Sequence, residues 1–346
     1  MKHLISVLIP NYNGKKFLKK SLGSLEKQTF RNFGVTVVDD GSTDGSVDFI
    51  KRDFNWVSVI KLEHVGVDRA LNYAIQRAEG TYVLLLDNDT WFNSRYLEKL
   101  ASEAKKNSLY DVISAKIWDR DKVVFRKANP TFQHTVSLFG YLVWHDYKKL
   151  DEFDVFAVGA GFTMYKRKVL TQPVFDPMYV AYAADIALCY RLIIKGSKIM
   201  MVDAVTNHYG GGTFKKRPGY AYMHAEKNRI ANFILHYQPF TMIRLFPLFL
   251  VSLLLHNIYS LPRIYYNLRA YSWVILNFPM LLRKRREIQR VRKIPDSNLT
   301  PLLSGRLFDE RSVSRLLRPF LFALNGISLA YLWLVGIKVI EHMRND

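Results

Sequence analysis

Two carboxylates placed two positions apart, Asp87 and Asp89, have the type and spacing needed to bind one divalent cation. They come directly after the apolar run Tyr82–Leu86, which is typical of a buried strand. Residues i and i+2 of an extended chain point the same way, so both side chains could share one cation or one ligand. Two acids at a strand end are also common in turns and helix caps, so this pattern alone does not identify a metal site.

The elements that must position these carboxylates repeat a strand, loop and helix pattern. The carboxyl ends of parallel strands meet at one sheet edge, where open α/β sheets bind ligands. We therefore predict an α/β fold with a doubly wound, mainly parallel sheet. The polar loops Pro10–Asn13, Asp39–Ser46 and Asp87–Asp89 should meet at that edge. The predicted strands are 4–9, 34–38, 57–62 and 82–86, and the predicted helices are 15–27 and 66–78.

The loops at this edge carry groups that could bind a nucleotide. The ring of Tyr12 could stack on a nucleobase, and Asp40 could accept the imide N–H of uracil, thymine or guanine. A second interpretation of Asp39–Ser46 is a helix N-terminus capped by Thr43 or Asp44. The sequence has neither a G-x-G-x-x-G after its first strand nor a P-loop motif, which argues against dinucleotide and P-loop enzymes.

Several motifs in order resemble a known family. Two of them are VLIPNYNGKKFLKKSLGSLEKQTFRNFGVTVVDDGSTDGS and HVGVDRALNYAIQRAEGTYVLLLDNDTWF. Both closely resemble the family 2 glycosyltransferases of GT-A fold, and the resemblance covers roughly residues 4–235. It continues in Gly159–Tyr165, in Asp185, in His208 before three glycines, and in Lys227-Asn228. The most similar members are bacterial and archaeal enzymes that extend cell-surface or lipid-linked glycans, including rhamnosyltransferase-like ones.

The resemblance implies a UDP, dTDP or GDP sugar donor, an Mn²⁺ or Mg²⁺ cofactor, and inversion at the anomeric carbon. It implies that Asp89 binds the metal directly and that Asp87 holds both the ribose and the metal. Arg69 and Asn72, one turn apart on the preceding helix, could face the nucleotide or belong to a plain surface. The donor-binding residues we expect are Pro10, Tyr12, Asn13, Asp39, Asp40, Arg69, Asn72, Asp87, Asn88 and Lys215.

Asp185 matches the aspartate that acts as catalytic base in the family and deprotonates the acceptor hydroxyl. The chain departs from the family pattern here, because Ala184 replaces the neighbouring glutamate and Ala187 a later aspartate. One alternative is that Asp185 only caps a helix running from Ile186 to Ile194. Another is an acceptor that is already an anion, as in polyprenyl-phosphate sugar synthesis. A third is a catalytically silent nucleotide-sugar-binding membrane protein.

His208 is the third candidate metal ligand. It could join Asp87 and Asp89 around the metal, donate to the diphosphate, or be a histidine satisfied by backbone at a strand end. Lys215 follows in the stretch GGGTFKKRPG and could clamp the donor phosphates, although charge runs are usually solvated. The single cysteine, Cys189, cannot form an internal disulfide, and no Cys/His cluster suggests zinc.

The composition changes near residue 236, so we predict two regions. Residues 1–236 form the catalytic domain, with a nucleotide-binding half 1–90 and an acceptor half 91–236. Residues 237–346 form a basic helical region. The chain enters its first strand without a secretory signal, which predicts a cytosolic catalytic domain.

The C-terminal region is predicted to associate with the membrane. Residues 241–346 hold 16 Lys/Arg against 6 Asp/Glu, so they carry half of the net charge of +20. They also contain the apolar segments 241–261, 264–282 and 319–340, of which the last is about long enough to span a bilayer. Tyr259, Tyr265, Tyr266, Tyr271, Trp273 and Trp333 are placed as headgroup-level anchors would be.

The basic cluster Arg283–Arg286 with Arg290, Arg292 and Lys293 is typical of binding to anionic membrane lipids on the cytoplasmic face. A nucleic-acid partner is not expected, because no nucleic-acid module accompanies the charge. The alternative is a helical subdomain that packs on the catalytic domain or on a second copy. Together these features predict a metal-dependent, inverting glycosyltransferase at the cytoplasmic face of the cell membrane, acting on a membrane- or lipid-linked glycan.

Overall fold

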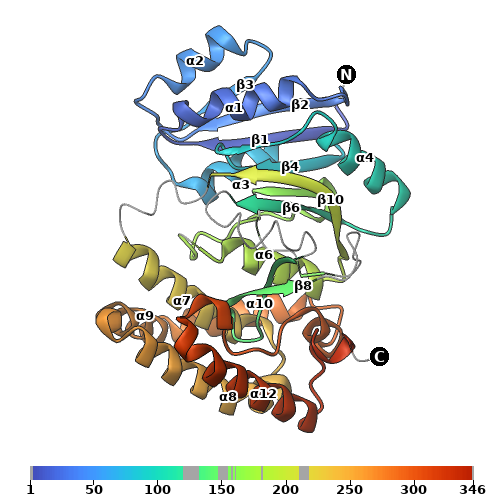
Figure 1. Ribbon diagram of the computed structural model, residues 1–346. Helices are drawn as coiled ribbons and strands as arrows, with labels where there is room; N and C mark the ends of the chain where they lie inside the picture. Colours follow the sequence, from blue (N-terminus) through green and yellow to red (C-terminus); the bar gives the residue numbers. More distant parts are fainter. Residues whose placement is uncertain are drawn as a thin grey trace. The chain divides into compact units, whose positions relative to one another are not determined.

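The computed structural model describes residues 3–119, 132–146, 155–156, 159, 161–180, 182–209 and 218–344. The chain forms two compact units (Figure 1). The first, here called the sheet unit, comprises Met1–Gln133, Asp146–Val180 and Ser197–Lys215. The second, the helical unit, comprises His134–His145, Ala181–Gly196 and Lys216–Asp346. This division differs from the predicted boundary at residue 236, since 181–196 and 216–236 group with the C-terminal helices.

The sheet unit is built on one mixed sheet with the strand order β3-β2-β1-β4-β9-β6-β10-β5. Strands β1 to β4 are parallel, β9 runs antiparallel to both β4 and β6, and β5 runs antiparallel to β10. The predicted mainly parallel sheet is therefore confirmed. The strands are β1 Ile5–Asn11, β2 Phe33–Asp39, β3 Ser58–Lys61, β4 Tyr82–Leu86, β5 Thr90–Trp91, β6 Val112–Asp119, β9 Phe162–Lys166 and β10 Ile199–His208.

Helices cover both faces of this sheet, as a doubly wound fold requires. Ile5, Val7 and Ile9 of β1 share one core with the apolar faces of α1, α2 and α4. Helix α3, whose buried residues are not part of that core, packs against β1 and β2 from the other face. The alternation of side chains along each strand supplies both cores. The helices are α1 Lys15–Glu26, α2 Ser46–Asp53, α3 Val67–Arg77, α4 Tyr96–Lys106 and the 3-10 turn η2 Arg167–Val169.

Two local expectations at the sheet edge were wrong. The first strand does not break at Pro10 but runs on to Asn11. Pairing of β1 with β4 ends at Leu8, so Pro10 lies where β1 has only β2 beside it and a proline can be accommodated. Helix α2 begins at Ser46 with Gly45 in the left-handed conformation as its N-cap, so neither Thr43 nor Asp44 occupies the cap position.

The helical unit is organised around α7. Helices α6, α9 and α10 contact α7, and the ring of Phe233 on α7 stacks on Phe249 of α8 with centroids 4.1 Å apart. The elements are β7 Phe132–Val136, β8 Leu142–Asp146, α6 Ala184–Ile194, α7 Pro218–His236, α8 Pro239–Tyr259, α9 Ile264–Leu276, α10 Phe278–Arg290, α11 Asp296–Leu299 and α12 Arg318–Leu334, with 3-10 turns η4 Leu261–Arg263, η5 Thr300–Leu302, η6 Glu310–Ser312, η7 Arg315–Leu317 and η8 His342–Arg344.

The end of α7 is bonded to residues on the far side of position 236. Arg285 and Gln289 of α10 donate to the carbonyls of Ile234 and Leu235, and Arg292 donates to the carbonyl of His236. The last carbonyls of a helix have no partner within that helix, so these donors satisfy them. Arg285 and Arg292 of the predicted lipid-binding cluster are therefore used inside the unit.

The apolar segments form shorter helices than expected. Segment 264–282 is divided into α9 and α10, and α10 begins with Pro279 in its first turn. The segment 319–340 is helical only to Leu334, because Gly336 takes a left-handed φ of 72°. Of the predicted anchors, Tyr271 is partly buried, and its hydroxyl lies 3.0 Å from Asn257 Oδ1 and 3.3 Å from Glu226 Oε1 within the unit. Among the described residues, two helices, Pro239–Tyr259 and Arg315–Leu334, are long and apolar enough to cross a membrane, which by itself is weak evidence.

Candidate functional site

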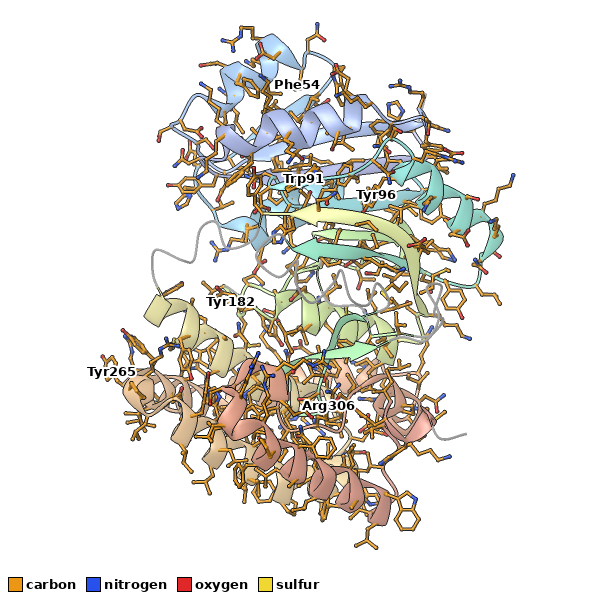
Figure 2. The ribbon with its side chains drawn as sticks, viewed as in Figure 1. Phe54, Trp91, Tyr96, Tyr182, Tyr265 and Arg306 are labelled. Atoms are coloured by element: carbon orange, nitrogen blue, oxygen red, sulfur yellow. The ribbon has the colours of Figure 1, made fainter. Side chains whose placement is uncertain are left out.

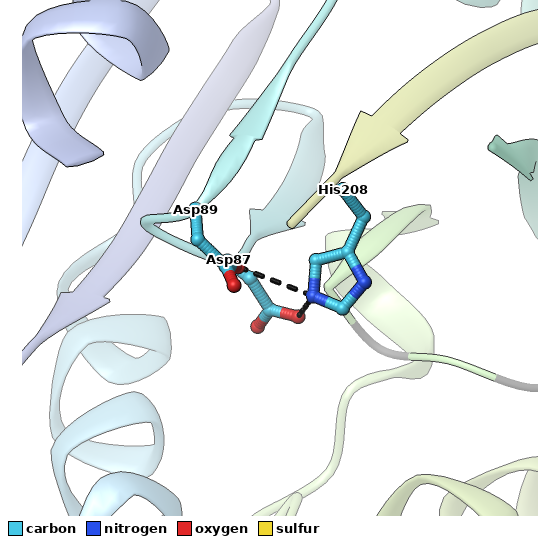
Figure 3. A group of neighbouring side chains, drawn as sticks. All are labelled: Asp87, Asp89 and His208. Atoms are coloured by element: carbon cyan, nitrogen blue, oxygen red, sulfur yellow. Dashed lines mark ion pairs between the residues drawn. The ribbon is translucent and has the colours of Figure 1, made fainter. Parts of the chain in front are cut away.

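Three side chains with metal-binding atoms converge at the carboxyl edge of the sheet (Figure 3). The Nε2 of His208 lies 3.2 Å from Oδ1 of Asp89 and 4.0 Å from Oδ2 of Asp87. One ligand atom from each residue lies within 4.8 Å of the others. The Asp89 side chain is 9% exposed and that of Asp87 49%, so the cluster is sheltered on one side and open on the other.

Strand pairing places these residues together. Asp87 and Asp89 follow β4, and β5 begins at Thr90, directly beyond them. The antiparallel pairing of β10 with β5 sets His208 opposite Thr90. His208 is 119 residues away from Asp89 in the sequence, so only this pairing brings it beside the carboxylates.

Gly161 leaves the space that the Asp87 side chain occupies. The Asp87 N–H donates to the Gly161 carbonyl at 3.1 Å, so the two backbones are in direct contact. A Cβ added at Gly161 would lie 2.2 Å from Oδ2 of Asp87. Real Cβ atoms do not approach other atoms this closely, so only glycine fits here while Asp87 keeps its position.

The three polar loops predicted to meet at this edge do meet. The Asn13 N–H donates to the Ser42 hydroxyl, which joins the first loop to the second. The Asn88 amide donates to the Asn11 side chain at 2.8 Å, and the Asn11 amide donates to Asp39 at 2.9 Å. Asparagine and aspartate side chains therefore connect all three loops in one hydrogen-bonded series.

Next to these loops, an aromatic pair and a buried carboxylate form the predicted nucleobase side of the site. The rings of Tyr12 and His64 are stacked with centroids 4.2 Å apart. Asp40 is buried and accepts from the N–H groups of Val65 at 2.6 Å and Gly66 at 2.9 Å. Each carboxylate oxygen has two acceptor positions, so Asp40 keeps acceptor capacity beyond these two bonds.

Other predicted donor-binding residues differ in position. Both side-chain groups of Asn72 are bonded to the Phe175 backbone, at 2.7 and 2.8 Å, so Asn72 joins α3 to that segment. Asp39 is buried and accepts from Asn11 and from the Ser42 N–H, so it also positions the loops. Donor binding by these two residues stays a prediction. Arg69 is exposed on α3 and remains a prediction. Lys215 lies outside the described residues.

Asp185 belongs to the helical unit and is the second residue of α6. The N-cap of this helix is Ala183, so the alternative in which Asp185 caps a helix beginning at Ile186 is wrong. A carboxylate in the first turn is favoured by the helix dipole. The approach to α6 is strained, because Val180, Tyr182 and Ala183 all have φ between 55° and 57°. Non-glycine residues in this region often mark functional sites.

Three residues of the site were not predicted from the sequence. Asn11 connects the loops, His64 stacks on Tyr12, and Gly161 accommodates Asp87. His64 could have been found, because it follows the third predicted strand and so lies at the same sheet edge. Asn11 and Gly161 lie inside segments that the sequence singles out, but their roles depend on contacts between segments far apart in the chain, which those motifs do not indicate.

The donor set fits a divalent cation. Two carboxylates suit Mn²⁺ or Mg²⁺, and the imidazole nitrogen favours a first-row transition metal over Mg²⁺, which generally prefers oxygen ligands. The open side at Asp87 leaves positions for ligand oxygens, as a cation that also binds a diphosphate needs.

A family model and several curated proteins are similar to the N-terminal part of the chain. Residues 6–172 match the model described as glycosyl transferase family 2. Glycosyltransferase GlyA of Streptococcus pneumoniae is 35% identical over 99 residues, which cover 28% of this chain and 14% of that protein. The uncharacterized glycosyltransferase EpsJ of Bacillus subtilis is 34% identical over 110 residues, which cover 31% of this chain and 32% of that protein. The matches thus span a third or less of these two relatives.

Solved structures share the fold. The crystal structure of TarS 1–349 from S. aureus in complex with UDP covers 97% of this chain and 90% of that chain, with a TM-score of 0.54 and 19% identity. The structure of GalNAc-T7 with UDP, GalNAc and Mn²⁺ covers 69% of this chain and 49% of that chain, with a TM-score of 0.53 and 16% identity. At these identities the likeness concerns the fold alone.

Proposed function

Because residues 6–172 belong to glycosyl transferase family 2 and the sheet unit has the GT-A fold, we propose that this chain is a metal-dependent, inverting glycosyltransferase. It moves a sugar from a nucleotide-diphosphate donor to a hydroxyl of a membrane- or lipid-linked glycan. It works at the cytoplasmic face of the cell membrane. The observation that carries this proposal is the convergence of Asp87, Asp89 and His208 at the sheet edge.

This cluster supports the binding of a diphosphate through a cation. Asp89, Asp87 and His208 would hold Mn²⁺ or Mg²⁺, which when bound neutralises the charge that develops on the departing diphosphate. Without a cation, the two carboxylates would repel the phosphates of the donor. The protein's own task is to hold the three side chains in place, which the β5–β10 pairing and Gly161 do.

The nucleobase would lie beside Tyr12 and Asp40. A pyrimidine can stack on an aromatic ring, and a carboxylate accepts an imide N–H well. UDP is the first nucleotide to test, because S. aureus TarS, which shares this fold, forms complexes with UDP and UDP-GlcNAc. dTDP carries the same imide donor and GDP a ring N–H at N1, and these two are the alternatives.

Asp185 is proposed as the base that takes the proton of the acceptor hydroxyl. Its carboxylate would accept this proton as the hydroxyl oxygen attacks the anomeric carbon, and the leaving diphosphate departs from the opposite face. A single displacement of this kind inverts the anomeric carbon. The position of Asp185 in the family motif and the strained backbone before α6 support this role.

The membrane-linked acceptor is proposed from the basic, apolar C-terminal helices. An enzyme held at the surface that carries its acceptor meets that acceptor at a higher effective concentration. The curated relatives include a putative teichuronic acid biosynthesis glycosyltransferase, TuaG of Bacillus subtilis, which is 34% identical over 102 residues, covering 28% of this chain and 40% of that protein.

The first experiment is calorimetric binding of UDP, dTDP and GDP, each with and without Mn²⁺, to the wild type and to Asp89→Asn. We expect one nucleotide to bind only with Mn²⁺, and the substitution to weaken that binding at least tenfold, because a metal ligand is lost. Asp48→Asn is the matched control, since Asp48 is an exposed carboxylate on α2 of the same unit. Absence of metal-dependent binding to all three nucleotides would favour a catalytically silent protein.

A second experiment tests whether Asp185 is the catalytic base or whether the acceptor needs no base. Asp185→Asn should lower kcat about 10²–10⁴-fold while donor affinity stays the same, since a general base contributes about that much. Unchanged turnover would remove Asp185 from the mechanism. It would favour an acceptor that needs no base, such as a polyprenyl phosphate, and that acceptor can be assayed directly.

A further inference from the structure

The outward surfaces of α8 and α12 carry almost no polar side chains. Every exposed residue of α8 is Pro, Phe, Ile, Leu, Val or Tyr, and every exposed residue of α12 is Pro, Phe, Ala, Gly, Ile, Trp or Leu. A helix at the surface of a water-soluble domain normally turns charged residues outward. The most exposed of these side chains include Ile243, Leu254 and Ile258 of α8 and Phe322, Ile327 and Trp333 of α12, all at least 61% exposed. These six define what we call the apolar face.

The inward surface of α12 carries the polar groups instead. Asn325 is buried, accepts from the Leu307 N–H at 2.8 Å, and donates to the Phe308 carbonyl and to Glu310. Ser328 is fully buried and donates to the Gly305 carbonyl. This helix is therefore polar inside and apolar outside, which is the reverse of the arrangement that water favours.

Helix α8 also turns polar groups inward, among buried leucine and phenylalanine side chains, and lies beside α12. Ser252 is fully buried, and His256 lies 3.0 Å from the Tyr222 hydroxyl and 3.5 Å from the buried Glu226. The hydroxyl of Tyr331 on α12 donates to the carbonyl of Arg244 on α8 at 2.9 Å, so the two helices are neighbours. In Figure 2, side chains project outward from both helices. The apolar face is therefore drawn from two neighbouring helices of the helical unit.

We propose that the apolar face lies flat in the interfacial layer of an anionic lipid bilayer, so that α8 and α12 enter one leaflet sideways and neither helix spans the membrane. This goes beyond the proposed membrane association by assigning its residues and its topology. It does not depend on sugar transfer, because it concerns the surface of the helical unit alone.

The inner contacts of the two helices argue against a spanning arrangement. Arg229 of α7 donates twice to the buried Glu226, at 2.6 and 2.8 Å, and α8 packs against this pair through His256. Burial opposes ionisation of Glu226, but the charge of Arg229 and its hydrogen bonds hold the pKa of Glu226 below its usual range. If α8 crossed the bilayer, this ion pair would have to enter the hydrocarbon with it, which is costly.

The buried side of α12 contacts a second group of ion-paired side chains. Arg306 lies 3.1 Å from Glu341 and 3.4 Å from Glu310, and Glu310 also accepts from Asn325. With the preceding turn η7, the helical stretch Arg315–Leu334 is about 30 Å long, so its length alone would permit a span, and these ion pairs are what argue against one. A helix that is apolar on one face and contacts charged side chains on the other suits the membrane interface.

Charge decides between a lipid surface and a second copy of the chain. Among residues 239–343, omitting Ser312, nine lysines and arginines are exposed but only one acidic residue, Glu287. Arg263, which follows α8, and Arg315 and Lys338, which flank α12, are among the nine. We call Arg263, Arg315 and Lys338 the basic rim. A second copy of the chain would bring its own positive charges against this rim, whereas anionic headgroups would neutralise the rim.

The first test measures binding of the full chain to vesicles, without any nucleotide. We expect sedimentation with vesicles of equal parts phosphatidylglycerol and phosphatidylcholine, and at least tenfold weaker binding to phosphatidylcholine alone, because the basic rim needs anionic headgroups. Ile327→Glu or Ile243→Glu should weaken binding to the mixed vesicles at least tenfold. Leu109→Glu is the matched control, since Leu109 is 79% exposed in the sheet unit and the change in charge is the same.

A second test distinguishes interfacial from spanning helices by depth. The single native cysteine, Cys189, is buried, so Phe320→Cys, Ile327→Cys and Leu334→Cys can each be labelled with a fluorophore. These positions lie two turns apart on one face of α12. We expect lipids with shallow nitroxides to quench all three labels alike, since the helix lies parallel to the surface.

Three outcomes would overturn the proposal. The first is no binding to anionic vesicles, or a loss with Leu109→Glu equal to the loss with Ile327→Glu. The second is a label at position 327 quenched best by deep nitroxides while those at 320 and 334 are quenched best by shallow ones, which would indicate a spanning helix. The third is a stable dimer in vesicle-free buffer that Ile327→Glu dissociates. None of them bears on sugar transfer, which calorimetry with Asp89→Asn tests separately.

Discussion

At the scale of single residues, the site depends on a few close approaches as well as on its charged groups. Asp87 and Asp89 are recognisable from the sequence because they follow an apolar strand. Their geometry also depends on Gly161, which directly precedes β9, and on His208 at the end of β10, both far along the chain. His208 was predicted from the sequence as a metal ligand, whereas Gly161, which shapes the site only through its contact with Asp87, was not.

Gly161→Ala should weaken Mn²⁺-dependent nucleotide binding about 10–100-fold, the loss typical of residues that orient a metal ligand. The added Cβ would meet Oδ2 of Asp87 at 2.2 Å, so Asp87 must turn away. Calorimetry measures the affinity. Gly23→Ala is the control, because a Cβ at Gly23 of α1 has no atom within 4 Å. Equal affinities of wild type and Gly161→Ala would show that Asp87 does not need this position.

At the scale of elements, one carboxylate holds the beginnings of two helices. Asp44 accepts from the Lys15 N–H at the start of α1 and from the Ser46 N–H at the start of α2, at 2.9 and 3.0 Å. The sequence predicted Asp44 as a cap of α2, but its place one residue before the N-cap lets it serve both helices. Because tertiary packing brings the start of α1 next to Asp44, this residue stabilises α1 as well as α2.

Asp44→Ala should lower the free energy of unfolding by about 1–2 kcal/mol, the usual effect of losing a cap. Burial raises the pKa of Asp44, but hydrogen bonds from Ser46 and Lys15 outweigh burial and lower that pKa below 3.8. The contribution is therefore present at neutral pH and is lost as pH falls below 3.8. Urea unfolding measures the difference. Asp53→Ala, which removes only a surface pair with Arg52, should change stability by less than half as much.

At the scale of the whole molecule, the helical unit contains buried ionisable groups that should make its stability depend on pH. His236 is fully buried at the end of α7, stacks on Tyr190 and hydrogen-bonds the Asn232 carbonyl. Burial, together with the charges of Arg191, Arg292 and Arg285, lowers the pKa of His236 to about 3. The folded chain therefore keeps this ring neutral under conditions in which the unfolded chain protonates it.

The pH dependence follows from the sign of this shift. Because the pKa of His236 is lower in the folded state, its effect on stability is full above pH 6.5 and is lost as pH falls from 6.5 toward 3. The expected slope is about 1.4 kcal/mol per pH unit for one proton. Urea unfolding of the wild type between pH 7 and 4.5 should show this fall in the free energy of unfolding. His236→Phe should show a slope that is smaller by about 1.4 kcal/mol per pH unit, because one titrating proton is removed. Identical slopes would contradict the assignment.

The sequence by itself determined the sheet and its edge. Apolar runs of strand length, each ending in a polar loop, require a parallel sheet whose loops meet at one edge, and this depends only on local pattern and chirality. The family resemblance then indicated the chemistry of Asp87, Asp89 and Asp185. None of this needed contacts between distant segments.

The tertiary structure alone decided which side chains contact one another and which helix faces remain exposed to solvent. The pairing of β10 with β5 places His208 beside Asp89, and the Asn72 side chain is hydrogen-bonded to the Phe175 backbone. Apolar segments read along the chain do not show which face of a helix is buried. Only packing shows that α12 buries Asn325 and exposes Ile327 and Trp333. The physical reason is that side-chain partners are set by distances in space, which local sequence does not encode.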